Sequence, residues 1–412
     1  MNFSIVTIAR NEEEVIDRFF QSIRRAFPQD VEVILVDTGS SDKTVEKARA
    51  HGAVVYTVGE RFVSKIDVLS AIYINQQVGN TIVQVDDRLF AFDEARNHSH
   101  SLSSKEWCLS MDLSQIIEYV DLSELQKEID SKKANSFMVD IYIEDRKFSS
   151  LRLYSKQHNK WDYSIHENIT PKNCEILNCL KIRHIRKDEK LKNYLPMTAY
   201  SYFFTKKDAR SLFYFARDLF NQKFYIEARK YLILCMNRVD GWSKERSMAA
   251  CLWAETFENF SEKINGYTRA YNIFPGWRTP IINLALLELS QNNPLAAVGY
   301  AERALEIPKQ EGKSYFSEKL SFYSTEPYRI RYEALLSLAI NCYLAESDPT
   351  RYLEKYLLVE EKTGKTNKEL LTGWDFAYKI FLNKDKKRAK FYFEKCLQID
   401  PSTYESAKNI FG

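Results

Sequence analysis

The segment FAFDEARNHSHSLSSKEWCLSMDLSQ, from Phe90 to Gln115, decides the fold of the N-terminal half of the chain. It predicts a polar helix that carries Arg96, then a turn, and then an apolar strand from Trp107 to Met111. Asp112 follows this strand directly. In open α/β sheets, ligands bind just beyond the carboxyl ends of the strands. We therefore expect Asp112 to face a ligand crevice that Arg96 can also reach.

The chain before this segment predicts two successive βα units. Residues 3–9 form a β-branched strand, and the apolar run at 31–36 is typical of a buried parallel strand. Asp37 closes that run, a helix is expected over 44–51, and 53–58 is the third strand. This order predicts the α/β class, with a doubly wound, mainly parallel sheet and a nucleotide crevice. Two interpretations of Asp37 stay open, a nucleotide-binding acid or a capping acid at the turn.

Composition limits the remaining possibilities. A chain of 412 residues predicts two or three domains. With 59 basic and 56 acidic residues the net charge is only +3, which gives no electrostatic footprint of a nucleic-acid partner. Seven scattered cysteines favour a reducing compartment and thus a cytoplasmic protein. The N-terminus is too acidic for a signal peptide, and no window holds the ~20 apolar residues of a transmembrane segment.

Two further features lie between the predicted strands. An insertion at about 59–89 contains apolar runs that predict ordered structure, and it carries the diacid Asp86-Asp87. Adjacent acids on a strand point to opposite faces, so a solvated turn is the favoured interpretation, although the pair could substitute for a lost metal ligand. Residues 137–143 and 148–154 predict a hairpin added to the edge of the sheet.

The pattern changes to helix after helix from about residue 208, with a period of about 34 residues that is typical of tetratricopeptide repeats. The best repeat places small, aromatic and proline residues at Ala377, Ala389, Phe393, Cys396 and Pro401. Such hairpins bury their apolar faces only by stacking, which predicts a small α-solenoid. The predicted domains are therefore 1–190, a linker at 191–207, and a helical repeat domain at 208–412.

Four groups of residues resemble motifs of the family 2 glycosyltransferases with the A-type fold, in particular members with a C-terminal tetratricopeptide array. These are Ile5, Val6, Asn11, Glu12 and Glu13; Val36, Asp37, Ser40, Asp42 and Thr44; Phe92 to Asn97 with Trp107 and Asp112; and Arg152 to Tyr154, Ile165 to Glu167 and His184. The resemblance covers most of residues 1–190 outside the insertion. It implies the nucleotide-diphospho-sugar transferase A-type fold and a nucleotide-sugar-dependent glycosyltransferase of the hexosyl-transferring type. One departure is Ser114, which stands where the family has a second acid.

The resemblance also implies a donor site. The expected nucleotide-sugar-binding residues are Ile8, Arg10, Asn11, Glu13, Asp37, Arg96, Asp112 and Ser114. Arg96 is expected to contact phosphate, and Asp112 the ribose or a divalent ion. Asp112 and His184 would be the protein ligands of Mn²⁺ or Mg²⁺. Because serine is a poor ligand for such hard cations, Ser114 weakens the prediction of a metal requirement.

Glu167 is the predicted general base, and Asp112 is the second residue expected in catalysis. Trp161 and His166 are expected to shape the acceptor pocket. The opposing interpretation of His166 and Glu167 is a buried, hydrogen-bonded histidine beside an exposed glutamate in an edge strand. Asp162 is the next candidate for the base.

Two functions remain on this basis. The first is an inverting glycosyltransferase that uses a nucleotide-diphosphate sugar, with a UDP-sugar as first candidate. Its acceptor would be a protein, peptide or glycan that the helical repeats present. The alternative is a catalytically inactive domain, marked by Ser114, that serves with its repeats as a binding scaffold. Joint presence of Asp37, Arg96, Asp112 and Glu167 favours the enzyme.

Overall fold

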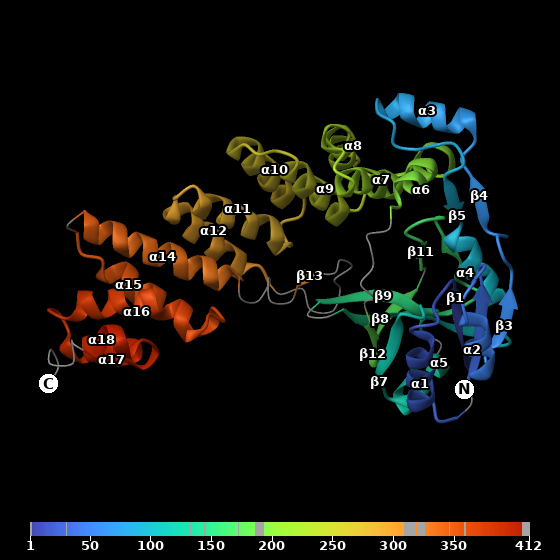
Figure 1. The fold of residues 1–412 in the computed structure, drawn as a ribbon, viewed down its shortest axis with the longest axis horizontal. Coiled ribbons are helices and arrows are strands. Elements are labelled where there is room, and N and C mark those ends of the chain that lie inside the picture. The colour runs from blue at the N-terminus through green and yellow to red at the C-terminus, as the bar shows by residue number, and fades with distance from the viewer. Residues whose placement is uncertain are drawn as a thin grey trace. The chain divides into compact units, whose positions relative to one another are not determined.

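The chain folds into two compact units (Figure 1). The computed structural model describes residues 2–29, 31–131, 133–143, 146–171, 173–185, 193–308, 318–319, 326–345, 347–357 and 360–405. The first unit comprises Met1–Thr256 with Gln310–Lys319, and the second comprises Phe257–Lys309 with Leu320–Gly412. The first helices of the repeat region thus belong to the same compact unit as the sheet.

A mixed sheet of nine strands forms the core of the first unit, and eight of them follow the order β3-β2-β1-β6-β9-β8-β12-β7. Their bounds are β1 Phe3–Ala9, β2 Glu32–Asp37, β3 Val54–Thr57, β6 Trp107–Ser110, β7 Gln115–Val120, β8 Ser136–Ile143, β9 Arg146–Ser155 and β12 Cys174–His184, and β13 (Glu318–Lys319) pairs with β9. The strands β3, β2, β1 and β6 are parallel, whereas β9 is antiparallel to both of its neighbours. This arrangement confirms the predicted α/β class with a mixed sheet.

The hairpin of β8 and β9 lies inside the sheet, so its predicted place at the edge is wrong. β9 pairs with β6, and β8 pairs in parallel with β12, while β7 forms the actual edge. The last two strands complete the sheet on that side because β12 returns beside β8 and then pairs antiparallel with β7.

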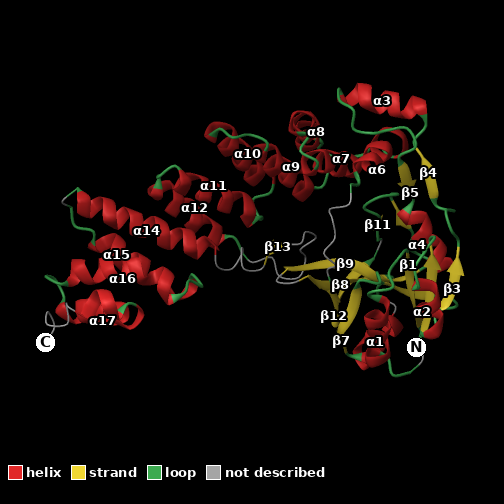
Figure 2. Cartoon of the chain, viewed as in Figure 1, coloured by secondary structure: helices red, strands yellow, loops and turns green. Residues whose placement is uncertain are grey.

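Figure 2 shows the strands of this sheet in yellow and the helices of the chain in red. Alternation along the strands separates two apolar faces. Phe3 and Ile5 pack with the buried side of α1 (Ile16–Ala26), in the same cluster as residues of α5 (Leu122–Ser131). Val6 points to the other face, where α4 (Phe92–Ser101) contacts β1 and β2. Another helix of this half, α2 (Thr44–Ala50), follows β2 and contacts β3. The packing of α4 places its charged face beside the carboxyl ends of the central strands.

The insertion is ordered, as predicted. A two-stranded sheet joins β4 (Val63–Lys65) to β5 (Arg88–Phe90), and α3 (Val68–Val78) lies between them in the chain. The Asp67 side chain caps α3 by accepting from the Ser70 amide. Asp86 has a φ of 69° and the Asp87 side chain accepts from the Gln84 amide, which supports the turn interpretation of the diacid.

Helices follow the sheet. The predicted linker contains α6 (Leu195–Tyr200) and a π-helix at Ser201–Thr205, while residues 191–192 lie outside the described part of the chain. The later helices are α7 Ala209–Asn221, α8 Tyr225–Asn237, α9 Ser243–Glu255, α10 Phe260–Ile273, α11 Arg278–Ser290, α12 Pro294–Glu306, α14 Glu326–Leu344, α15 Thr350–Leu357, α16 Asn367–Phe381, α17 Lys386–Ile399 and α18 Pro401–Tyr404. Ala377, Ala389 and Cys396 are fully buried in the cluster that α16 and α17 share, as the repeat pattern requires. None of the helices in the described residues has the length and apolar character needed to cross a bilayer.

Candidate active site

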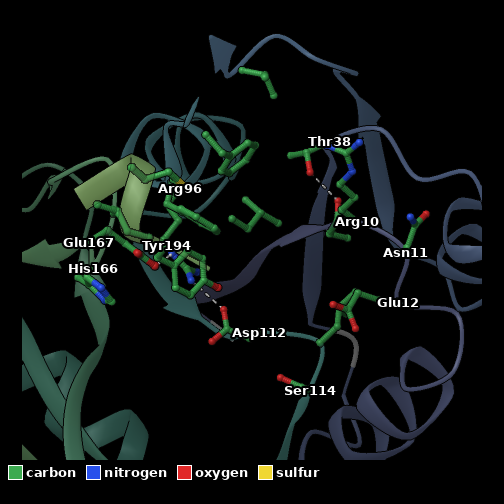
Figure 3. Close-up of a pocket in the computed structure, with 18 of the residues that line it drawn as sticks. Arg10, Asn11, Glu12, Thr38, Arg96, Asp112, Ser114, His166, Glu167 and Tyr194 are labelled. Atoms are coloured by element: carbon green, nitrogen blue, oxygen red, sulfur yellow. Dashed lines mark hydrogen bonds and ion pairs between the residues drawn. The ribbon is translucent and has the colours of Figure 1, made fainter. Parts of the chain in front are cut away.

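A cavity of about 690 Å³ lies at the carboxyl ends of the central parallel strands (Figure 3). Nine of the predicted site residues line it, namely Ile8, Arg10, Asn11, Arg96, Asp112, Ser114, His166, Glu167 and His184. Sequence reasoning missed other lining residues, among them Thr38, Arg88, Phe90, Tyr194 and Met197. Figure 3 shows Arg96, Glu167 and Tyr194 on one side of the cavity and Arg10, Asn11 and Thr38 on the other.

Arg96 connects the two predicted catalytic acids. Its Nε donates to Glu167 Oε1 at 2.7 Å, and its NH2 group donates to Asp112 Oδ1 at 2.8 Å. The arginine side chain is only 8% exposed, so its burial would lower its pKa, but the two carboxylates outweigh this effect and raise the pKa of Arg96. The guanidinium also lies over the Trp161 ring, with 5.1 Å between its central carbon and the ring centroid. Arg96 is therefore held in place by protein groups, and its predicted contact with phosphate stays a prediction.

Asp112 has a second cationic neighbour that the sequence did not assign to the site. Arg152 on β9 lies with NH2 3.6 Å from Asp112 Oδ2. Burial would raise the pKa of Asp112, but the Arg96 and Arg152 guanidinium groups hold it well below its usual range. Arg152 stands between the buried residues Leu151 and Leu153 of β9. A charged residue between two buried leucines, at a position that the motif of Arg152 to Tyr154 also marks, was the available signal.

Asp37 and Glu13 do not line the cavity; their carboxylates accept hydrogen bonds from backbone amides instead. Asp37 is buried, and its carboxylate accepts from the backbone amides of Gly39 and Ser40 at 3.1–3.3 Å. Glu13 Oε2 accepts from the Lys43 amide at 3.0 Å. These contacts shape the turn after β2, which fits the structural interpretation of Asp37 that the sequence left open. This turn also places Thr38 in the wall of the cavity.

The loop that carries Glu167 is held by helix α7, which lies in the same compact unit. Arg217 NH2 lies 2.9 Å from His166 Nε2, and Arg210 NH2 donates to the His166 carbonyl at 3.2 Å. The His166 ring stacks on Tyr214 with 4.1 Å between centroids. Burial lowers the pKa of His166, although the nearby Asp218 acts against this shift. His166 has a φ of 53°, a left-handed conformation that a non-glycine residue adopts only when its surroundings hold it.

Of the two residues predicted to shape the acceptor pocket, one lines the cavity and the other is buried behind it. His166 lines the cavity, but its ring is engaged by α7. Trp161 is buried outside the cavity lining, where its Nε1 donates to the Tyr154 hydroxyl at 2.8 Å. Tyr194, which the sequence did not select, faces the cavity beside Asp112 (Figure 3).

A comparison with protein families finds a match in the N-terminal part of the chain. Residues 4–65 match the model of glycosyl transferase family 2. This part of the chain is therefore similar to glycosyl transferase family 2. The match runs from β1 to the end of β4 and therefore confirms the resemblance that the first two motifs indicated. No curated protein matches the sequence significantly.

Several solved structures are similar to the chain. Crystalline S. aureus TarS is 12% identical, with 66% of this chain and 55% of that chain covered and a TM-score of 0.36. The 1–349 fragment of S. aureus TarS in complex with UDP-GlcNAc is 13% identical, with 88% and 91% covered and a TM-score of 0.32. YrrB, a TPR protein with an unusual peptide-binding site, is 16% identical, with 50% and 94% covered and a TM-score of 0.34. The chain thus spans about half, 55%, of the length of the first TarS chain.

The cavity offers a poor donor set for a divalent ion. Across the described residues, no three His, Cys, Asp or Glu side chains are grouped as a metal ion requires. Asp112 presents its two oxygens to Arg96 and Arg152, and the Ser114 hydroxyl lies 3.4 Å from His184 Nδ1. One charge-neutralised carboxylate and a serine do not fit an ion that the protein holds by itself. Coordination of Mn²⁺ or Mg²⁺ by Asp112 and His184 stays a prediction.

Proposed function

We propose that the protein is an inverting glycosyltransferase that transfers a sugar from a nucleotide-diphosphate sugar, with a UDP-sugar as first candidate, to a protein, peptide or glycan. The observation that carries the proposal is the bridge of Arg96 between Asp112 and Glu167 on the cavity wall of a family 2 domain. A buried charge network contributes little net stability, because desolvation offsets the attraction between its members. Its presence at a cavity is better explained by chemistry.

Glu167 is the candidate general base. The acceptor hydroxyl must lose a proton as it attacks the sugar, which requires a basic oxygen on the acceptor side. Glu167 Oε1 accepts from Arg96, and Oε2 has no partner among the described residues. Asp112 is a weaker base because two guanidinium groups lower its pKa. Arg96 orients the Glu167 carboxylate and thus keeps its second oxygen directed for proton transfer.

The nucleotide is assigned to the opposite wall, where the chain leaves β1 and β2. Ile8, Arg10, Asn11 and Thr38 line the cavity there. Asn11 has a φ of 54°, a conformation that asparagine tolerates, and its side-chain oxygen accepts from the Ser41 amide at 2.8 Å. These contacts preorganise the wall before a donor binds. An acceptor would enter on the side of Tyr194 and Glu167, and its recognition by the second unit is part of the proposal.

Thermal unfolding with a panel of nucleoside diphosphates and nucleotide sugars tests the proposal. A donor at 100 times its dissociation constant should stabilise the native state by about 2.7 kcal/mol. Donor hydrolysis measured by release of nucleoside diphosphate, with and without Mn²⁺, then tests turnover. If no nucleotide raises the unfolding temperature, the donor site is refuted. Nucleotide binding without hydrolysis or transfer would instead favour the scaffold function that Ser114 suggests.

A further inference from the structure

The rim of the cavity carries two arginines that share one carboxylate. Arg10 follows β1, and Arg88 begins β5, and both line the cavity. Arg10 NH2 lies 3.3 Å from Glu60 Oε1, and Arg88 NH2 forms a short ion pair with Glu60 Oε2. The three side chains are between 42% and 54% exposed, in contrast to the buried Arg96. Glu60 and Arg88 both come from the insertion at 59–89, for which the sequence offered no function.

The charge balance of the cavity identifies what this pair can bind. Arg96 is committed to Glu167 and Asp112, and Arg152 also faces Asp112. The positive charge of those inner guanidinium groups is already balanced by the two acids. Among the described residues, Arg10 and Arg88 pair with a single carboxylate, that of the exposed Glu60. Exposed ion pairs contribute little to stability. They are the cavity-lining arginines that an incoming anion can recruit at low cost.

We propose that Arg10 and Arg88 bind the diphosphate of the nucleotide sugar and that Glu60 occupies their guanidinium groups until the donor displaces it. The inference rests on the proposed function and deepens it. Carboxylate and phosphate oxygens suit the same planar guanidinium fork, so a side-chain carboxylate that bridges two arginines marks a place where phosphate oxygens fit. The donor diphosphate replaces the Glu60 carboxylate, and the two arginines already lie close together before the donor binds.

This exchange gives the insertion a role in the transfer reaction. Arg88 is brought to the cavity by the pairing of β5 with β4, since Lys65 lies opposite Arg88 in that small sheet. Positive charge at the rim stabilises the diphosphate as the bond between the sugar and the phosphate oxygen breaks. The pair thereby supplies the neutralisation that Arg96 is too constrained to provide.

Isothermal titration calorimetry of the full-length protein tests the assignment with UDP and GDP, and with uridine and guanosine as phosphate-free probes. Arg88→Gln should weaken binding of the preferred diphosphate about 10–100-fold, the range expected for one lost hydrogen bond to a charged group. Nucleoside binding should be unchanged. Glu60→Gln should strengthen diphosphate binding because it removes the competing anion. Arg61→Gln is the matched control, because Arg61 lies in the same insertion but outside the cavity lining and should leave every affinity unchanged.

Each outcome separates the two levels of the proposal. If the wild-type protein binds a diphosphate and Arg88→Gln binds it equally well, the arginine pair is refuted while the donor site stands. If Glu60→Gln weakens binding as much as Arg88→Gln, Glu60 supports the arginines structurally and the exchange is refuted. If the wild-type protein binds no nucleoside diphosphate, the proposed function fails and the diphosphate assignment fails with it.

Discussion

Helix α7 should control turnover through its hold on the loop that carries Glu167, and Arg217→Met tests this. The change keeps an apolar stem and removes the guanidinium group. The native group lies 2.9 Å from His166 Nε2 and 4.5 Å from the Tyr214 ring centroid. A hydrogen bond to a charged group contributes about 1.5–3 kcal/mol, and a cation–π contact about 0.5–1 kcal/mol. Because the side chain of Arg217 is 25% exposed, we take the low end, about 2 kcal/mol.

The energy of the Arg217 contacts is comparable to the backbone strain at His166 that they offset. The left-handed backbone of His166 costs about 1–3 kcal/mol, so loss of the clamp should let the loop relax and move Glu167 away from its bridge with Arg96. About 2 kcal/mol corresponds to a factor of roughly 30 in the population of the held loop. We therefore expect kcat to fall about 10–30-fold. Donor affinity should change little, because Arg217 lies outside the cavity lining.

Steady-state donor hydrolysis and calorimetric donor binding measure the two quantities separately. Arg303→Met is the matched control, because Arg303 is 56% exposed and pairs with Glu306 in the second unit. It should leave kcat and donor affinity as in the wild type. Equal kcat for Arg217→Met and the wild type would refute the coupling. A parallel loss of donor binding and thermal stability would show general unfolding rather than a displaced loop.

The remaining predictions concern single groups and the second unit. Glu167→Gln should lower turnover about 10²–10⁴-fold with nearly unchanged donor affinity, and near-normal turnover would move the base to Asp162. Ser114→Asp should raise affinity for Mn²⁺ in calorimetry, because hard cations prefer carboxylate oxygens; equal affinity would place Ser114 outside any metal site. A chain shortened after Thr256 should keep donor hydrolysis and lose transfer if the second unit binds the acceptor, and an equal transfer rate would give that unit a structural role. Burial lowers the pKa of His100 from 6.5 to about 4, so the unfolded chain binds the proton first and stability falls as pH decreases from 6.5 through 4. At 1.36 kcal/mol per pH unit the loss approaches about 3 kcal/mol, and urea unfolding of His100→Gln should lack it.

Local patterns were sufficient for the first half of the sheet. β1, β2 and β3 form where the sequence predicts them because their apolar residues fall in runs of strand length within short windows. The same reasoning failed for the hairpin of β8 and β9. Its place in the sheet is set by β12, which pairs with β8 across more than thirty residues of sequence. The register shifts once in that pairing and once more where β12 pairs with β7. Periodicity reports which face of a strand is buried, but not which strand becomes its neighbour.

The candidate site shows the same limit at the level of side chains. Motif positions were enough to select Arg96, Asp112 and Glu167, and all three line one cavity. The sequence could not show that Arg96 forms ion pairs with both acids. The loop that carries Glu167 takes its conformation from α7, which lies some fifty residues later in the chain. For the same reason a cut near residue 205, which the repeat pattern alone suggests, would remove the helix that holds the loop.

The arginines in and around the cavity are thus of two kinds, which differ in how far their side chains are exposed. Arg96 and Arg152 are buried, and their acids neutralise them within a network that leaves little room for exchange. Arg10 and Arg88 are exposed at the rim and share one exchangeable carboxylate. Salt screens exposed charges far more than buried ones, so the rim pair should make diphosphate binding depend on ionic strength, while the buried network should not. A fixed inner network can orient a proton acceptor, because its geometry does not change when the donor arrives. A loosely held outer pair can receive a diphosphate, because the anion that it replaces is already half in solvent.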